Sequence, residues 1–175
     1  MKVFCISGKA GAGKDTLGTQ IETNLKEHGL NALVIHYADL LKWICSKYFG
    51  WDGSKDVKGR SLLQYVGTEQ IRSKEPDYWV NFVIDIMKFF PDTWDAVIIP
   101  DCRFPNEIEK LREAGFDVVH IRIERPGYNI LTEEQMKHPS EVALDNYPVD
   151  IRVRNDGTLW DLYHNYAREI VDQFC

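Results

Sequence analysis

The feature that most constrains this chain is a glycine-rich segment, Gly8 to Thr16, which lies between a predicted strand and a predicted helix. It reads Gly-Lys-Ala-Gly-Ala-Gly-Lys-Asp-Thr and fits the spacing GxxxxGK. Lys2 to Ser7 has the short apolar pattern of a buried strand, and Leu17 and Ile21 recur at helical spacing. A loop in this setting turns its backbone N–H groups inward at a helix start, which is an arrangement that binds phosphate.

The loop is therefore expected to bind the phosphates of ATP, with Lys14 as a solvent-facing cation for the β- and γ-phosphates. The donor-binding residues expected in the loop are Gly8, Ala10, Gly11, Ala12, Gly13, Lys14, Asp15 and Thr16. Asp15 stands where a hydroxyl would reach Mg²⁺, so we assign that hydroxyl to Thr16. Asp15 either acts through a metal-bound water or caps the helix, and both alternatives stay open.

Strand and helix patterns alternate along the chain, which predicts an α/β fold with a parallel sheet and helices on both faces. The expected strands are Lys2 to Ser7, Ala32 to His36, Ala96 to Pro100, Val118 to Ile123 and Asp150 to Val153. About sixty residues separate the second strand from the third, which is more than a crossover helix needs. The excess predicts a helical insert above the carboxyl edge of the sheet.

Composition restricts the partners and the compartment. The 175 residues fit one domain, and a net charge of −6 argues against a nucleic acid polymer as partner. No apolar run is long enough to span a membrane. Cys5, Cys45, Cys102 and Cys175 are widely spaced without a CxxC pair, so we expect neither a zinc site nor a disulfide framework. The simple expectation is a reduced cytoplasmic compartment, which is the host cytoplasm if a phage encodes the chain.

The third predicted strand leads into Asp101 and Arg103. A carboxylate after an apolar strand can hold Mg²⁺ through its water shell, so Asp101 and Thr16 are the expected metal residues. Arg103 could bind an acceptor phosphate with both arms of its guanidinium. The alternatives are a turn-forming role for Asp101 and a surface ion pair between Arg103 and Glu107.

With these motifs in hand, the chain resembles the phage-type deoxynucleoside monophosphate kinases. The segments that carry the resemblance are GKAGAGKDT, Tyr37 to Lys42, Leu63 to Arg72, and Asp101 to Glu107 in the pattern DxRFxNE. Two further segments, His138 to Glu141 and Asn155 to Thr158, are also similar to dephospho-CoA kinase and phosphomevalonate kinase relatives.

The resemblance implies a P-loop fold of three layers, α/β/α, with a five-stranded parallel sheet. It also implies an enzyme that transfers the γ-phosphate of ATP to a deoxynucleoside 5′-monophosphate, with Mg²⁺ as cofactor. It implies a single domain with its core at 1–38, 94–124 and 148–175, an acceptor-binding insert at 39–93 and a lid at 125–140. We expect a monomer or a homodimer. The alternatives are a kinase of another small phosphate ester, such as dephospho-CoA, and a non-catalytic nucleotide-binding switch.

The remaining candidate residues follow from their places in this scheme. For the acceptor we expect contacts from Asp39, Lys42, Gln64, Thr68, Arg72, Trp79 and Arg103. Asp39 could instead be a helix N-cap, and Trp79 a core aromatic residue. Arg125 is expected to neutralise transition-state charge from a mobile lid. Additional ATP contacts are expected from Arg122, Asn155 and Gly157.

Overall fold

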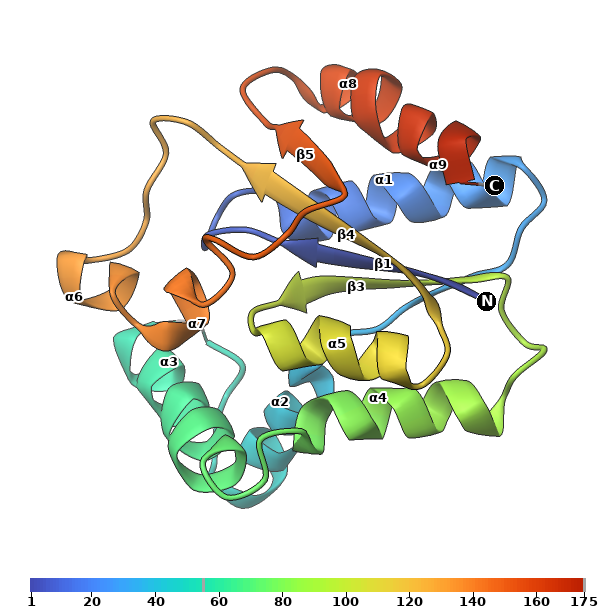
Figure 1. The fold of residues 1–175 in the computed structure, drawn as a ribbon. Helices are drawn as coiled ribbons and strands as arrows, with labels where there is room; N and C mark the ends of the chain where they lie inside the picture. The colour runs from blue at the N-terminus through green and yellow to red at the C-terminus, as the bar shows by residue number, and fades with distance from the viewer. Residues whose placement is uncertain (55, 175) are drawn as a thin grey trace.

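The computed structural model describes residues 1–54 and 56–174. One parallel sheet of five strands runs through it in the order β2-β3-β1-β4-β5 (Figure 1). The strands are β1 Lys2–Ser7, β2 Ala32–Val34, β3 Ala96–Cys102, β4 Asp117–Glu124 and β5 Ile151–Arg154. The predicted α/β fold with a five-stranded parallel sheet is confirmed.

The central strand β1 fixes where the loops meet. It pairs in parallel with β3 and β4, so Ser7 at its end lies opposite Cys102 and Arg122. Because the strands are parallel, the loops that leave β1, β3 and β4 all emerge at one edge of the sheet. The phosphate loop, the Asp101–Arg103 region and the start of the lid are thereby brought together.

Alternation along β1 supplies both layers of the core. Phe4 and Ile6 face one cluster of apolar residues, whereas Val3 and Cys5 face the other. The first face is covered by α1 (Lys14–Glu27) and by the C-terminal run α8 (Leu159–Leu162), η2 (Tyr163–Ala167) and α9 (Arg168–Phe174). The second is covered by α4 (Tyr78–Phe89) and α5 (Pro105–Glu113), on the opposite side of the sheet in Figure 1.

Strand ends differ from the sequence prediction for local reasons. Strand β3 continues through Pro100 to Cys102, two residues further than expected. Its register with β1 shifts between Cys5 and Ser7, and such an irregularity accommodates a proline that cannot donate a backbone hydrogen bond. Strand β2 ends at Val34 and not at His36, because the chain turns there into α2 (Ala38–Tyr48).

The insert contains α2, α3 (Val57–Gln64), the π-helical segment η1 (Tyr65–Arg72) and α4. Helix α3 begins at Val57, because Asp56 caps it by accepting the backbone N–H of Gly59 at 2.7 Å. The segment η1 follows α3 directly, and its turns are wider than those of an α-helix.

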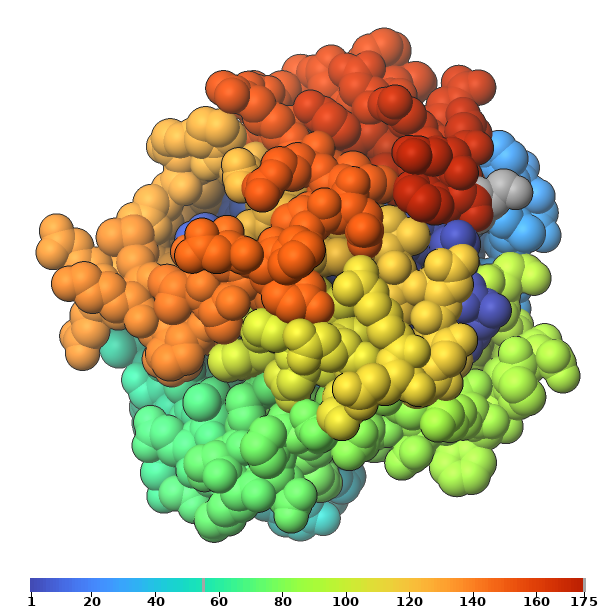
Figure 2. Space-filling view, in the orientation of Figure 1, coloured from blue at the N-terminus to red at the C-terminus, as the bar shows by residue number. Residues whose placement is uncertain are grey.

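The segment at 125–138, which makes up most of the expected lid, carries one helical turn, α6 (Glu133–Met136), and is followed by α7 (Pro139–Val142). This segment lies beside α3 of the insert, on the left of the molecule in Figure 1 and Figure 2. Cys5, Cys45 and Cys102 are free and buried, whereas Cys175 lies outside the described residues. Within the described ranges, no helix has the length and apolar character needed to cross a lipid bilayer.

Candidate active site

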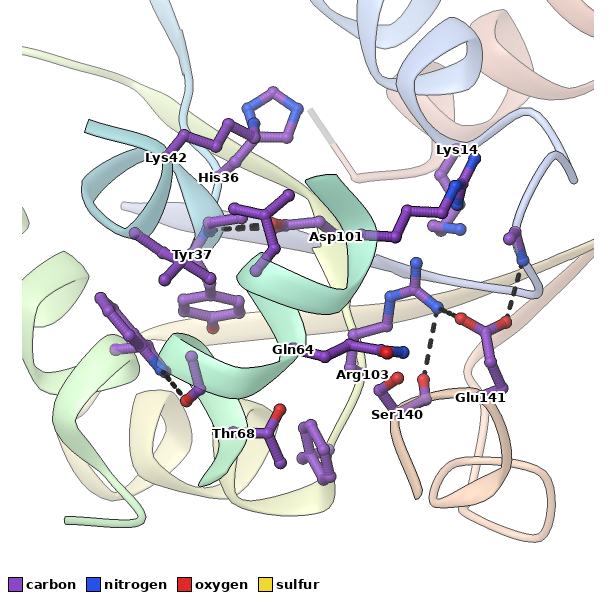
Figure 3. A pocket seen from close by; sticks show the side chains of 18 of the residues that line it. Lys14, His36, Tyr37, Lys42, Gln64, Thr68, Asp101, Arg103, Ser140 and Glu141 are labelled. Carbon is purple, nitrogen blue, oxygen red and sulfur yellow. Dashed lines mark hydrogen bonds and ion pairs between the residues drawn. The ribbon is translucent and has the colours of Figure 1, made fainter. Parts of the chain in front are cut away.

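Two cavities open beside the phosphate loop at the carboxyl edge of the sheet. The larger, of about 570 Å³, lies between the insert, the end of β3 and the lid (Figure 3). The smaller, of about 370 Å³, lies between the start of α1 and the turn from β5 into α8. Gly11, Lys14 and Asp15 line both cavities. The phosphate loop is therefore a shared wall, and a group bound to it can be reached from either side.

Glycine is required at two corners of this loop. Gly8 has a φ of 155°, and a Cβ there would lie 2.4 Å from the carbonyl oxygen of Ile123. Gly13 has a φ of 102° and is the N-cap residue of α1. A side chain at either position would collide or force an unfavourable backbone conformation. The loop can thus pass close to β4 and enter α1 directly.

Lys14 lies in the interior of the loop. Its Nζ donates hydrogen bonds to the carbonyl oxygens of Gly8 at 2.8 Å and Lys9 at 2.9 Å. Burial, together with the positive charge of Arg103, lowers the pKa of Lys14 to about 8. The expectation that Lys14 faces solvent is wrong, since only 7% of the residue is exposed. The negative charge of a bound phosphate would stabilise the ammonium form of Lys14.

The unusual residue Asp15 is paired with His36, which sequence reasoning missed. Its Oδ1 lies 2.8 Å from Nε2 of His36, and this hydrogen bond raises the pKa of the imidazole. The other ring nitrogen lies 3.4 Å from Asp39. Asp15 is not the cap of α1, because Gly13 is the N-cap residue. The helix-capping alternative is therefore wrong.

Asp101 organises the turn between β2 and α2. Its two carboxylate oxygens accept the backbone N–H groups of Tyr37 and Ala38, each at 3.0 Å. Burial raises the pKa of Asp101, while His36 and the two backbone hydrogen bonds oppose that rise. The side chain lines the larger cavity, as an acid that serves a ligand must. Its metal-binding role stays a prediction.

Arg103 points into the larger cavity from the end of β3 (Figure 3). Its Nη1 pairs with Glu141 and also donates to the carbonyl oxygen of Ser140 at 3.3 Å. The alternative ion pair with Glu107 is wrong. The buried carboxylate of Glu107 instead accepts the backbone N–H of Arg103 at 2.6 Å and pairs with Arg72 at 2.5 Å.

Most of the expected acceptor residues line the larger cavity, namely Lys42, Gln64, Thr68, Arg72, Trp79 and Arg103. Asp39 does not belong to the described lining. It accepts the backbone N–H of His36 and pairs with Lys42 at 3.1 Å, but the N-cap residue of α2 is Tyr37, so the N-cap alternative for Asp39 is wrong. Trp79 is 4% exposed, and its Nε1 donates to Gly67 at 3.2 Å. Its indole is thus part of the core and forms the floor of the cavity.

Three of the expected site residues outside the loop line the smaller cavity, namely the catalytic candidate Arg125 and the ATP-binding candidates Asn155 and Gly157. Asn155 donates to the carbonyl oxygen of Ala12 at 2.9 Å, which ties the turn after β5 to the phosphate loop. The guanidinium of Arg125 lies 4.1 Å from the ring centre of Tyr128. Within the described lining, Arg122 faces neither cavity, because it is buried and paired with Asp145 at 2.6 Å.

Sequence reasoning missed several lining residues. In the smaller cavity these are Leu159 and Leu162, and in the larger one His36, Tyr37, Glu107 and Glu141. Tyr37, Glu107 and Glu141 lie within the motifs that carry the family resemblance, but the motifs alone assign them no ligand contact. Leu159, Leu162 and His36 carry no local signal beyond a helix start or a polar residue next to a motif.

Comparison with known proteins agrees with this geometry. Residues 48–166 match the family described as "Deoxynucleotide monophosphate kinase". The deoxynucleotide monophosphate kinase of Enterobacteria phage T4 is 32% identical over 106 residues, a match that covers 59% of this chain and 42% of the phage protein. A putative deoxynucleotide monophosphate kinase of Acanthamoeba polyphaga mimivirus is 27% identical over 194 residues, a match that covers 93% of this chain and 93% of the mimivirus protein. The chain thus spans about two fifths of the phage relatives that it matches.

Solved structures support the fold. The APS kinase CysC of Mycobacterium tuberculosis, in complex with AMPPNP and APS, superimposes with a TM-score of 0.56 at 15% identity, over 98% of this chain and 95% of that one. The shikimate kinase of Aquifex aeolicus gives a TM-score of 0.50 at 12% identity, over 99% and 95% of the two chains. At such identities the likeness concerns the fold alone.

Proposed function

This chain belongs to the deoxynucleotide monophosphate kinase family, and from that premise we propose that it transfers the γ-phosphate of ATP to the 5′-phosphate of a deoxynucleoside monophosphate. The observation that supports this most directly is the pair of cavities that share Gly11, Lys14 and Asp15. A donor in one cavity and an acceptor in the other would meet at the phosphate loop.

In this proposal ATP occupies the smaller cavity. Its phosphates follow the loop toward Lys14, and Arg125 and Asn155 flank them from the β4 and β5 side. The monophosphate occupies the larger cavity, with its sugar and base between α2, α3 and η1. Lys42, Arg72 and Arg103 supply positive charge on that side, which suits a phosphate group.

The reaction then needs positioning more than proton transfer. An oxygen of the acceptor phosphate attacks the γ-phosphorus, and the bond from that phosphorus to the bridging oxygen of ADP breaks. Lys14 and Arg103 both line the larger cavity, so they can share the negative charge that spreads over the transferred group. The products are ADP and the deoxynucleoside diphosphate.

The site has oxygen donors of the kind that Mg²⁺ prefers. Thr16 lines the smaller cavity and Asp101 the larger one, while Asp15 lines both. Each Asp101 oxygen accepts one backbone hydrogen bond and keeps further lone pairs for a metal-bound water. Thr16 and Asp101 would hold the ion, which would neutralise phosphate charge when bound.

The lid would exclude water. Ile130, Leu131 and Gln135 line the larger cavity from the lid at 125–140, opposite the insert at 39–93. Closure over two bound substrates would remove water from the transferred group before reaction. A cytoplasmic location, and a monomer or homodimer as the assembly, are part of the same proposal.

A coupled assay of ADP release tests the function. The purified protein is mixed with ATP and Mg²⁺, alone and with each deoxynucleoside monophosphate, its ribose counterpart, or dephospho-CoA. We expect ADP release that depends on at least one deoxynucleoside monophosphate. Turnover only with dephospho-CoA would replace the acceptor, and nucleotide binding without acceptor-dependent turnover would favour the switch.

A further inference from the structure

The segment from Ser140 to Asp145 is bonded to the phosphate loop at three points. The Nζ of Lys9 donates to the carbonyl oxygen of Glu141 at 2.6 Å and to both carboxylate oxygens of Asp145, at 2.9 and 2.7 Å. The backbone N–H of Ala10 donates to Oε2 of Glu141 at 3.0 Å. Two residues at the tip of the loop are thus held by one short segment at the base of the lid.

The other carboxylate oxygen of Glu141 pairs with Nη1 of Arg103 (Figure 3). A single side chain therefore joins the loop backbone to an arginine from a different strand. The Glu141 side chain is 8% exposed, so water screens this charge pair much less than it would at the surface. Asp145 carries a second ion pair, to Arg122, which holds the end of the segment in place.

The local sequence explains how Glu141 reaches this position. His138 caps α7, since its ring nitrogen accepts the backbone N–H of Ser140 at 3.2 Å. Pro139 then occupies the first helical position, where a proline fits. The motif His-Pro-Ser-Glu thus makes a sharp helix start, and Glu141 follows within the first turn. The cap and the proline fix the backbone that carries Glu141.

Arg103 keeps one side of its guanidinium available. Within the described part of the chain, its side-chain hydrogen bonds all leave from Nη1, so Nε and Nη2 have no protein partner. These two groups form the edge of the fork that can hold two oxygens of a phosphate. Ala10 lines the larger cavity and is absent from the described lining of the smaller one. The bridge therefore lies on the acceptor side of the loop.

We propose that Glu141 is a positioning residue for phosphoryl transfer, which fixes the Arg103 guanidinium against the phosphate loop so that its free edge faces the acceptor phosphate. This inference rests on the proposed function. Its physical basis is that an arginine held at one nitrogen loses less freedom when it binds an oxyanion with the others. The bridge from the phosphate loop through Glu141 to Arg103 also keeps the acceptor at a set distance from the loop that holds the donor.

The test is Glu141→Gln, which preserves the shape of the side chain but turns one acceptor oxygen into an NH₂ donor. That donor must face either Ala10 N–H or Arg103, so the bridge breaks at one end. We expect kcat/KM for the monophosphate to fall about 10- to 100-fold, while KM for ATP changes less than about two-fold. Glu169→Gln, the same change at an exposed residue of α9, is the matched control and should behave as wild type.

A double-mutant cycle separates positioning from general stability. If Glu141 acts through Arg103, then adding Glu141→Gln to Arg103→Lys should cost less than about three-fold, because the residue to be positioned is already altered. If the losses in kcat/KM of Glu141→Gln and Arg103→Lys multiply in full in the double variant, the inference is overturned. An unchanged kcat/KM in Glu141→Gln alone would overturn it as well. Thermal unfolding shows whether each variant is folded at the assay temperature, and Glu141→Asp, which keeps the charge but shortens the reach, should reproduce the loss.

A measurement without substrate distinguishes this inference from the proposed function. In NMR spectra of protein labelled with ¹⁵N-arginine, a guanidinium held at Nη1 rotates slowly and gives separate Nη signals. One such set of Nη signals should be missing from the spectrum of Arg103→Lys. In Glu141→Gln the same set should collapse into one averaged signal. An inactive wild type that keeps this set would sink the phosphotransfer proposal alone, whereas averaged signals in an active wild type would sink the role of Glu141.

Discussion

The Asp101 carboxylate accepts the backbone N–H of Tyr37 at 3.0 Å, so the acid at the end of β3 determines how the chain leaves β2. Ala38, the first residue of α2, donates to the other oxygen of the same carboxylate. A residue proposed to serve a metal ion therefore also holds the helix that carries Lys42. Its removal should affect stability and activity together.

Asp101→Asn tests this dual role. The amide keeps one acceptor but places an NH₂ group opposite a backbone N–H, so one hydrogen bond is replaced by two facing donors. We expect the free energy of unfolding in urea to fall by about 1–3 kcal/mol, and the rate at limiting Mg²⁺ to fall as well. Unchanged activity at limiting Mg²⁺ would remove Asp101 from the metal site, whatever the change in stability.

Arg103→Lys tests the acceptor site. Lysine keeps the charge but has no planar fork, so it cannot hold two phosphate oxygens at once. We expect kcat/KM for the monophosphate to fall about 100-fold, or about 2.7 kcal/mol, with ATP binding retained. Arg168→Lys, at an exposed position of α9, is the control. A loss of ATP affinity with an unchanged monophosphate KM would instead place Arg103 in the donor site.

Lys14→Met tests the phosphate loop. Methionine fills similar space without a charge, so phosphoryl transfer should be abolished. The melting temperature at pH 7 should not fall by more than a few degrees, because burial already disfavours the charged ammonium, as its pKa of about 8 shows. Lys110→Met on α5 provides the control, with activity unchanged. Near-normal turnover in folded Lys14→Met protein would refute the assignment of the loop.

His120 should make stability depend on pH. It is fully buried, with Nε2 at 2.8 Å from the hydroxyl of Ser7 and Nδ1 at 2.7 Å from the carbonyl oxygen of Pro148. Burial lowers its pKa, and the charges of Arg122 and Arg112 add to this effect, while the Pro148 carbonyl and Asp150 oppose it. The unfolded chain therefore binds a proton at a higher pH than the folded protein does.

The sign follows from linkage. The stability that neutral His120 contributes is present above its unfolded pKa of about 6.5 and is lost as pH falls toward the lower folded value. Urea unfolding at pH 7.5, 6.5 and 5.5 should show this decline, and His120→Gln should flatten it. His164→Gln, at an exposed site in η2, should leave the decline intact. Equal pH dependence in both variants would contradict the assignment.

The lid should respond to substrates. Hydrogen exchange across residues 125–138 should slow when a bisubstrate analogue is added, because Ile130, Leu131 and Gln135 would close on the occupied cavity. ATP alone should have a smaller effect, since these residues lie on the acceptor side. Equal exchange with and without the analogue would indicate a static segment.

The sequence predicted the elements whose signals are local. The glycine spacing of the phosphate loop, the apolar run before Asp101 and the alternation of strands and helices each depend on neighbouring residues. The sheet order then brought Lys14 and Arg103 to one edge. That much of the site follows from parallel strands and motif positions.

The parts that could not be predicted depend on long-range contacts or on backbone detail. The pair between Arg103 and Glu141 joins residues 38 positions apart, and nothing in the local pattern of either residue selects the other. Gln64, Thr68 and Arg72 were expected to contact the acceptor, but the sequence did not predict the π-helical segment that carries Thr68 and Arg72. All three residues line the larger cavity. Burial of Lys14 was likewise invisible, because it results from the carbonyl groups of a folded loop.

The position of β1 has a consequence for the order of folding. The strand that comes first along the sequence lies in the middle of the sheet, and its partners begin at Ala96 and Asp117. It cannot form either pairing until about a hundred residues have followed it, and closing such long loops costs entropy before any contact repays it. During synthesis its apolar residues must therefore remain without strand partners for several seconds, at about 5–20 residues per second. Of the five strands, the one that leads into the phosphate loop thus waits longest for a strand partner.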